Sequence, residues 1–261
     1  MQKSFTDQMN RRVEIPFPPK RIISLVPSQS ELLWDLGLQT QLQGITKFCI
    51  HPTEMFQHVP RVGGTKKLNI ELIEKIQPDL IIGNKEENTR EEIEILQNKF
   101  SVWMSDVNSF NDAIRMIQQI GEITDTAEKS SALIREIENS FQNIPLPNQV
   151  IDVVYLIWKN PYMAAGQHCF INDMLVKAGL VNKIDTGRYP EITISQLKAI
   201  SPDLLILSTE PYPFSEKDVH YFQHELPHAK IWLANGEMFT WYGSRMKHAA
   251  SYFTHNLARF F

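Results

Sequence analysis

The sequence predicts an α/β fold of two doubly wound lobes, each built on a mostly parallel sheet, joined by a long interdomain helix. Two observations carry this prediction. A pattern of strands and helices in the first part of the chain recurs in the same order in the last part. The only long run with a sustained helical period, residues 109–143, lies between the two copies. We therefore divide the chain into an N-terminal lobe (1–108), an interlobe helical backbone (109–148) and a C-terminal lobe (149–261).

The repeat has two matching parts in each copy. Residues 69–82 (NIELIEKIQPDLII) match residues 193–206 (TISQLKAISPDLLI), and each copy is typical of a short capped helix, a Pro-Asp turn and a buried strand. Upstream of each copy, a strand leads to a helix that ends at Gly37 or at Gly179. A period this long indicates a duplicated domain rather than a solenoid.

The central segment reads as a short helix followed by a long one. Ser109 and Asp112 stand at capping-box spacing before the first helix, and Asp125 with Glu128 offers a second cap. Prolines then close the segment. The alternative is that these are two ordinary packed helices of a single domain.

Composition narrows the class of protein. The 261 residues are 43% hydrophobic, which is ample for a packed core. A net charge of −4 and the lack of any basic cluster argue against a nucleic-acid partner. The two cysteines, Cys49 and Cys169, cannot alone form a disulfide framework or a thiolate metal site.

The first residues of the sequence are compatible with two cellular locations. Residues 1–9 lack the apolar core of a secretory signal, and no run approaches the ~18 apolar residues of a membrane span. The chain is then either cytoplasmic or, if a signal has been removed, periplasmic or at the cell surface.

In the N-terminal lobe, a hairpin over residues 5–15 precedes a strand at 21–26. Ser28 and Glu31 stand at capping-box spacing and open the helix that follows. Further elements are expected in the order strand 43–48, a helix capped by Asn69, strand 80–82, helix 89–100 and strand 102–104. Alternation of strands and helices predicts crossover connections and a parallel sheet.

The C-terminal lobe repeats this order. Residues 151–157 form a nearly continuous apolar run, as expected for a strand covered on both faces. The elements that follow are expected as a helix near 171–179, strands at 204–207 and 231–234, and a final helix that runs to the chain end.

Aromatic and cationic residues gather where the predicted strands end. In open α/β sheets this edge holds the ligand, so we expect an aromatic, positively charged cleft between the lobes for a flat or bulky ligand with anionic groups. The alternative is that loops merely collect polar residues and that the aromatics near Gly243 pack the last helix. The candidate ligand contacts are Lys47, Phe48, Lys66, Asn84, Lys85, Trp158, Tyr162, Arg188, Tyr189, Phe239, Trp241, Tyr242 and Arg245, with Lys159 and Glu210 at the same edge.

Several motifs together resemble a known family. The sequences RIISLVPSQSE (21–31), LGL (36–38), VGGT (62–65), NIELI (69–73) and QPDLII (77–82), with the central helix, are similar to the helical-backbone, or class III, substrate-binding proteins of ABC importers. The likeness covers nearly the whole chain and is strongest to the cobalamin-binding branch, whose relatives carry ferric siderophores and haem.

The resemblance implies a monomeric, non-catalytic binder with little hinge bending. Its ligand would be a metal chelate, with no covalently bound cofactor, and its protein partner an ABC permease bound transiently. Such proteins dock through one glutamate on each lobe, which pairs with permease arginines. Glu71 matches the first of these, but Ser195 stands at the second position, where Glu191 could substitute. An exposed first-turn acid favoured by the helix dipole is the alternative for Glu71.

Histidines and cysteines give weaker signals. His220, His224 and His228 have helical spacing, but a proline precedes the third and no acidic partner completes a zinc motif, so no metal site is expected. His51 and His168 follow rim strands and could reach a chelated metal, or be ordinary surface histidines. We expect Cys49 and Cys169, at comparable rim positions, to be unrelated free thiols.

Two other functions stay open. A chelatase-like enzyme would need a histidine beside a carboxylate, such as His51 with Glu86 or His168 with Glu237. No nucleophile elbow, phosphate loop or dinucleotide fingerprint is present. A cytosolic chelate carrier or sensor without a transport role would fit the lack of a signal sequence and of a second docking acid.

Overall fold

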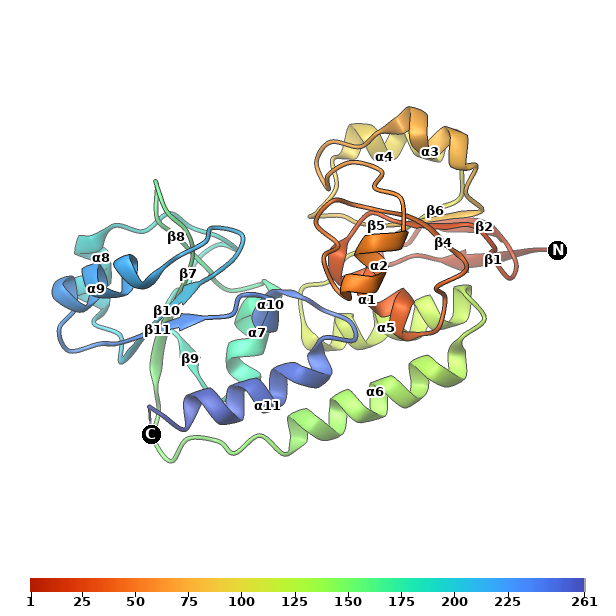
Figure 1. Cartoon of the computed structure of the whole chain (residues 1–261). Helices are drawn as coiled ribbons and strands as arrows, with labels where there is room; N and C mark the ends of the chain where they lie inside the picture. The colour runs from red at the N-terminus through yellow and green to blue at the C-terminus, as the bar shows by residue number, and fades with distance from the viewer. Residues whose placement is uncertain (261) are drawn as a thin grey trace. The chain divides into compact units, whose positions relative to one another are not determined.

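The computed structural model describes residues 1–260, which fall into two units (Figure 1). The first unit contains Met1–Val107, Asn111–Ile137 and Tyr242–Arg245. The second contains Asn108–Phe110, Glu138–Trp241 and the stretch that starts at Met246. The mixed α/β class with parallel sheets is as predicted.

The first unit is built on a parallel sheet with the order β4-β3-β5-β6. Every residue of β3 and β5 is buried, as expected for strands covered on both faces. The hairpin of β1 and β2 forms a separate antiparallel sheet, as predicted. The elements are β1 (Gln2–Thr6), β2 (Arg12–Pro16), β3 (Ile22–Ser24), α1 (Pro27–Asp35), β4 (Leu42–Ile45), α2 (Thr53–His58), α3 (Ile70–Ile76), β5 (Leu80–Asn84), α4 (Arg90–Gln97) and β6 (Val102–Ser105).

Helix α1 corrects one local prediction. It begins at Pro27, with Val26 as its N-cap, and no side chain caps it. Proline fits the first helical position because its fixed φ suits a helix and its missing N–H would have had no partner there. The expected capping box of Ser28 and Glu31 is therefore wrong: Ser28 is buried inside the helix, and Glu31 pairs with Arg245.

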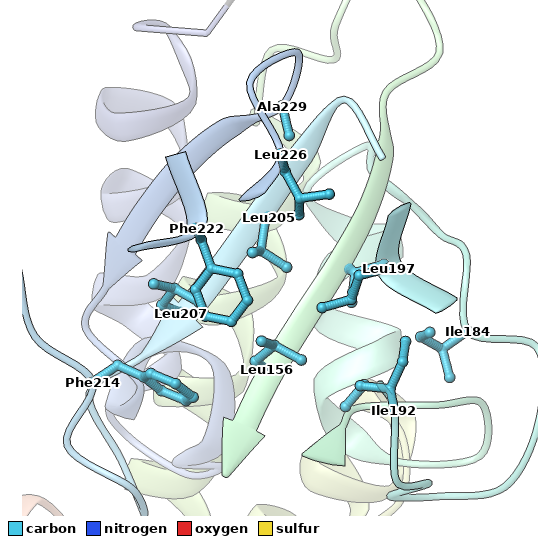
Figure 2. Packing of buried hydrophobic residues seen from close by; sticks show 12 residues of the cluster. Leu156, Ile184, Ile192, Leu197, Leu205, Leu207, Phe214, Phe222, Leu226 and Ala229 are labelled. Atoms are coloured by element: carbon cyan, nitrogen blue, oxygen red, sulfur yellow. The ribbon is translucent and has the colours of Figure 1, made fainter. Parts of the chain in front are cut away.

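The second unit repeats the scheme with the order β11-β10-β7, flanked by β9 and β8. All pairs are parallel except β7 with β8. Leu156, Leu205 and Leu207 extend from the sheet to the side where Leu197 and Phe222 pack (Figure 2). The elements are β7 (Asp152–Trp158), β8 (Met163–Ala164), α7 (Phe170–Lys177), β9 (Val181–Asn182), α8 (Ile194–Ile200), β10 (Leu204–Ser208), α9 (Glu216–Glu225), β11 (Lys230–Ala234), α10 (Glu237–Thr240) and α11 (Met246–Leu257).

The two sheets confirm the internal repeat. Strands β4, β3, β5 and β6 correspond in order to β9, β7, β10 and β11. The aspartate of each Pro-Asp turn plays the same part: Asp79 Oδ2 accepts hydrogen bonds from the amides of Lys20 and Arg21 at 2.8 and 3.0 Å. Asp203 Oδ2 accepts from the amide of Asp152 at 2.9 Å. Each aspartate thus ties its turn to the start of the neighbouring strand.

The central segment forms two helices, α5 (Phe110–Ile123) and α6 (Ala127–Gln142). They approach closely at Gly121, where a Cβ would lie 2.0 Å from Ser130 Oγ. The expected cap at Asp125 is wrong, because α6 begins at Ala127 and Asp125 lies two residues earlier in a left-handed conformation, φ 61°. No helix within residues 1–260 is long and apolar enough to cross a membrane.

Candidate functional site

In the first unit, the carboxyl ends of the parallel strands place several predicted residues around a groove. Its volume is about 970 Å³, and Lys47, Phe48 and Lys66 all line it. Lys47 and Phe48 follow β4, and the Lys47 ammonium lies 5.0 Å from the Phe48 ring centre. Phe48 is 49% exposed, which is unusual for a phenylalanine and makes its ring available to a ligand.

Two neighbouring residues have structural roles instead. Asn84 is buried, and its side chain accepts hydrogen bonds from the amides of Glu86 and Glu87 at 2.8 and 3.1 Å. It therefore shapes the loop after β5, and its burial leaves almost no exposed surface for the predicted ligand contact. Lys85 is exposed and pairs with Asp106 at 2.6 Å.

In the second unit, Trp158 at the end of β7 is an exposed aromatic residue, as Phe48 is in the first unit. It is 40% exposed and meets Tyr212 edge-on, with 5.7 Å between ring centres. Tyr162 is more enclosed, 5.3 Å from the Phe222 ring, and burial raises its pKa. Lys159 is held by Asp218 at 2.6 Å, so this cation is neutralised within the protein.

Arg188 lies at a second cavity, of about 570 Å³, within the second unit. Its guanidinium carbon is 5.8 Å from the ring centre of Tyr189. His168, at the same cavity, is exposed and has a left-handed backbone, φ 62°. The cavity is lined by Asn108, Ser109, His168, Cys169, Asn172, Asp173 and Arg188.

The aromatic run after β11 is mostly a packing element. Phe239 has no exposed surface, because α10 turns its ring into a cluster with Phe253 at 4.6 Å and Tyr155 at 5.0 Å. It is a core residue and not a ligand contact in this structure. Trp241 and Tyr242 are also buried, and burial raises the pKa of the Tyr242 phenol.

Arg245 is also engaged inside the protein. Its guanidinium donates to both carboxylate oxygens of Glu31, at 2.6 and 2.9 Å. This two-point pairing attaches the Tyr242–Arg245 segment to α1 of the first unit. The residue was predicted from its loop position alone, which carries no information about such a distant partner.

The thiols and the spaced histidines do not come together as a metal site. Neither Cys49 nor Cys169 forms a disulfide, as predicted, and both thiols are buried. On α9, His220 pairs with a carbonyl of its own helix at 2.7 Å, and His228 lies beyond the helix end. Over residues 1–260, no group of three or more His, Cys, Asp or Glu side chains could hold a metal ion.

The two docking positions are both exposed but differ in charge. Glu71 lies in the first turn of α3. Ser195 occupies the corresponding place in α8, whose first turn has no acidic residue. Sequence reasoning missed two residues of the groove, Arg61 and Lys67. Lys67 directly follows Lys66 in the sequence, which was the available signal.

A sequence profile described as periplasmic binding protein matches residues 22–232, a span that draws on both units. The chain belongs to this family. The family match confirms the resemblance that the motifs RIISLVPSQSE (21–31), VGGT (62–65) and QPDLII (77–82) carry.

Known members of the family extend the comparison. An uncharacterized ABC transporter substrate-binding lipoprotein of Bacillus subtilis is 25% identical over 212 residues, which are 77% of this chain and 67% of that protein. The vitamin B12-binding protein of Vibrio cholerae is 25% identical over 199 residues, 74% of this chain and 72% of that protein. The crystal structure of the periplasmic vitamin B12-binding protein BtuF of Vibrio cholerae has a TM-score of 0.79 at 22% identity, covering 94% of this chain and 99% of that one. This chain therefore has the two-lobed fold of solute-binding proteins.

Proposed function

We propose that the chain is the substrate-binding component of an ABC importer and that it binds a metal chelate: cobalamin, haem or a ferric siderophore. The observation that carries the proposal is the family match across both units, together with relatives that bind vitamin B12 or belong to ABC transporters. It acts outside the cytoplasmic membrane and meets its permease only transiently.

The exposed aromatic in each unit supports a flat ligand. Phe48 follows β4 and Trp158 is the last residue of β7, and both are large apolar side chains left open to solvent. Aromatic faces in such positions suit a corrin, a porphyrin or a catecholate chelate, which offer wide planar surfaces. The proposal is that Phe48 and Trp158 are contacts of the ligand and that the groove cations near Phe48 pair with its anionic groups.

One observation favours a second function. The first turn of α8 has no acid where a two-point docking surface needs one. A chelate carrier or sensor that has lost transport would not need this acid. Uptake of the ligand by cells that carry an ABC permease, measured with and without this binding protein, separates the two functions.

The first prediction tests the ligand class. Purified protein is titrated with cobalamin, haem and a set of ferric siderophores, with absorbance and melting temperature as readouts. A true ligand binds saturably and raises the melting temperature by mass action. We expect Trp158→Ala to weaken that binding about tenfold, because the variant loses a stacking face worth about 1–2 kcal/mol.

The controls are exposed apolar residues away from the strand ends. Ile95→Ala in α4 and Val176→Ala in α7 remove comparably exposed surface and should leave the affinity unchanged. Absence of saturable binding to every chelate would overturn the proposed function, and equal losses in Trp158→Ala and Val176→Ala would remove Trp158 from the site.

A further inference from the structure

The groove of the first unit has more positive charge than its surroundings neutralise. Lys47, Arg61, Lys66 and Lys67 line it, whereas Glu71 is its one acidic residue. Within the described part of the chain none of the four cations forms an ion pair with a carboxylate. Lys66 donates to the backbone carbonyl of Glu86, and Arg61 donates to that of Val59. The Lys66 charge also acts on the nearby Glu87 carboxylate, so Lys47, Arg61 and Lys67 are the cations that remain for an anion from outside.

The loop between these cations also leaves backbone donors unused. The carbonyls of Gly63 and Lys67 each accept a backbone hydrogen bond of 2.8 Å, and that of Thr65 accepts one of 3.0 Å from the Asn88 side chain. Three of the loop's carbonyls, those of residues 63, 65 and 67, are thus satisfied within the protein. The amides of residues 65–67 donate to no acceptor in residues 1–260.

Two glycines give the loop this conformation. Gly63 has φ 111°, and a Cβ there would lie 2.5 Å from the carbonyl oxygen of Lys67. At Gly64 a Cβ would lie 3.3 Å from the Phe48 ring and 3.4 Å from the Lys47 side chain. Glycine therefore lets the loop pass close to both side chains, and residues 65–67 of the loop line the same groove.

We propose that this groove is an oxyanion site that takes a carboxylate or phosphate group of the bound ligand. Successive backbone amides flanked by cations form a concave anion site, because both kinds of donor favour negative oxygen. The exposed Phe48 ring beside it offers an apolar surface for the rest of the ligand. The assignment rests on the proposed function. It adds that the transported chelate carries free carboxylate or phosphate groups.

The site is tested with metal-free probes: citrate for carboxylates and inorganic phosphate for phosphates. Amide NMR spectra are recorded during each titration. We expect the resonances of residues 65–67 to shift saturably, with an affinity that falls as sodium chloride is added, because salt screens exposed charges. The stronger probe identifies which oxyanion the site takes. No shift at residues 65–67 with either probe would overturn the assignment.

A matched pair of variants separates the site from general charge effects. Lys47→Gln/Lys67→Gln removes two groove cations, and Lys20→Gln/Lys75→Gln removes two exposed lysines of the same unit outside the groove. We expect about a tenfold loss of anion affinity in the first and none in the second, from about 0.7 kcal/mol for each exposed charge. Equal losses in both would overturn a specific site.

Chelates then separate this inference from the proposed function. A chelate with free carboxylates should bind the groove variant about tenfold more weakly, while its esterified form should bind both proteins alike. A chelate that binds the wild type and the groove variant equally would overturn the inference and leave the proposed function standing. Binding of citrate at residues 65–67 without binding of any chelate would overturn the proposed function and leave the oxyanion site standing.

Discussion

Phe48 and Cys49 are neighbours in sequence but have opposite environments. Phe48 is half exposed beside the groove, whereas the Cys49 sulfur is buried and lies 3.1 Å from both Ser30 Oγ and Thr46 Oγ1. Burial raises the pKa of the Cys49 thiol, and the hydrogen bonds from Ser30 and Thr46 only partly oppose it. Of these two consecutive residues after β4, the first therefore has its side chain at the surface and the second has its side chain in the core.

The second prediction follows from this thiol. In a Cys169→Ala background, Cys49 should react with an aromatic disulfide reagent at pH 8 about a hundredfold more slowly than free cysteine, because the thiolate is scarce and the sulfur is covered. Denaturant should restore full reactivity. Release of thionitrobenzoate measures both rates, and fast labelling of the folded protein would contradict the buried thiol.

The third prediction concerns Asp218 in the first turn of α9. Burial alone would raise its pKa, but hydrogen bonds from Lys159 and from Ser215 outweigh burial and hold the pKa below its usual range. The stability contributed by this carboxylate is therefore present above the unfolded pKa of about 3.9 and is lost as pH falls through the lower folded value. Asp218→Asn should cost about 2 kcal/mol at pH 7.

The pH profile makes that prediction specific. Urea unfolding at pH 7 and near pH 3 should show the difference between wild type and Asp218→Asn shrinking at the lower pH. Lys159→Met should behave similarly, because it removes the cation that lowers the Asp218 pKa. A difference that stays constant with pH would mean that the carboxylate charge does not contribute.

At the scale of elements, the structure shows which sequence patterns are sufficient to predict a strand or a helix. Strands β3, β5, β7 and β10 were predictable because a central parallel strand is apolar on both faces. The internal repeat then predicted the helices that connect these strands. Helix α2 and the two-residue strands β8 and β9 were not found, because elements this short carry no periodicity and depend on the neighbouring strand that pairs with them.

The candidate site was predictable to a smaller extent. Topology placed Phe48, Lys66 and Trp158 at strand ends, where the structure finds them exposed. The same rule also selected Asn84 and Phe239, which are buried. Whether a side chain after a strand faces solvent or the core depends on distant packing partners, such as the Phe253 ring for Phe239, and local sequence does not encode these partners.

The fourth prediction tests the duplicated Pro-Asp turns. Asp79→Ala leaves two backbone amides without their acceptor, whereas Asp203→Ala leaves one at a more exposed position. We expect losses in the free energy of unfolding of about 1–2 kcal/mol for Asp79→Ala and about 0.5–1 kcal/mol for Asp203→Ala. Urea unfolding measures both. The reverse order would show that the two turns do not share one function.

At the scale of the whole molecule, the chain contributes to each unit from several separate stretches. Ile137 and Glu138 are consecutive in α6 yet belong to different units, and Tyr242–Arg245 returns to the first unit between two stretches of the second. Each unit has its own sheet and hydrophobic core. Under the proposed function, we expect the permease to meet α3 at Glu71 and α8 at Ser195.

The fifth prediction concerns that partner. Glu71→Ala should abolish most ligand uptake by cells that carry the permease, because α8 has no first-turn acid to maintain docking alone. Its chelate affinity should not fall, because Glu71 is the one acidic residue of the groove and its removal takes away no donor to an anionic ligand. The matched control is Glu91→Ala, which removes an equally exposed first-turn acid from α4. Ser195→Glu should raise uptake by restoring the second contact. Normal uptake in Glu71→Ala, with ligand affinity intact, would show that this helix does not meet the permease.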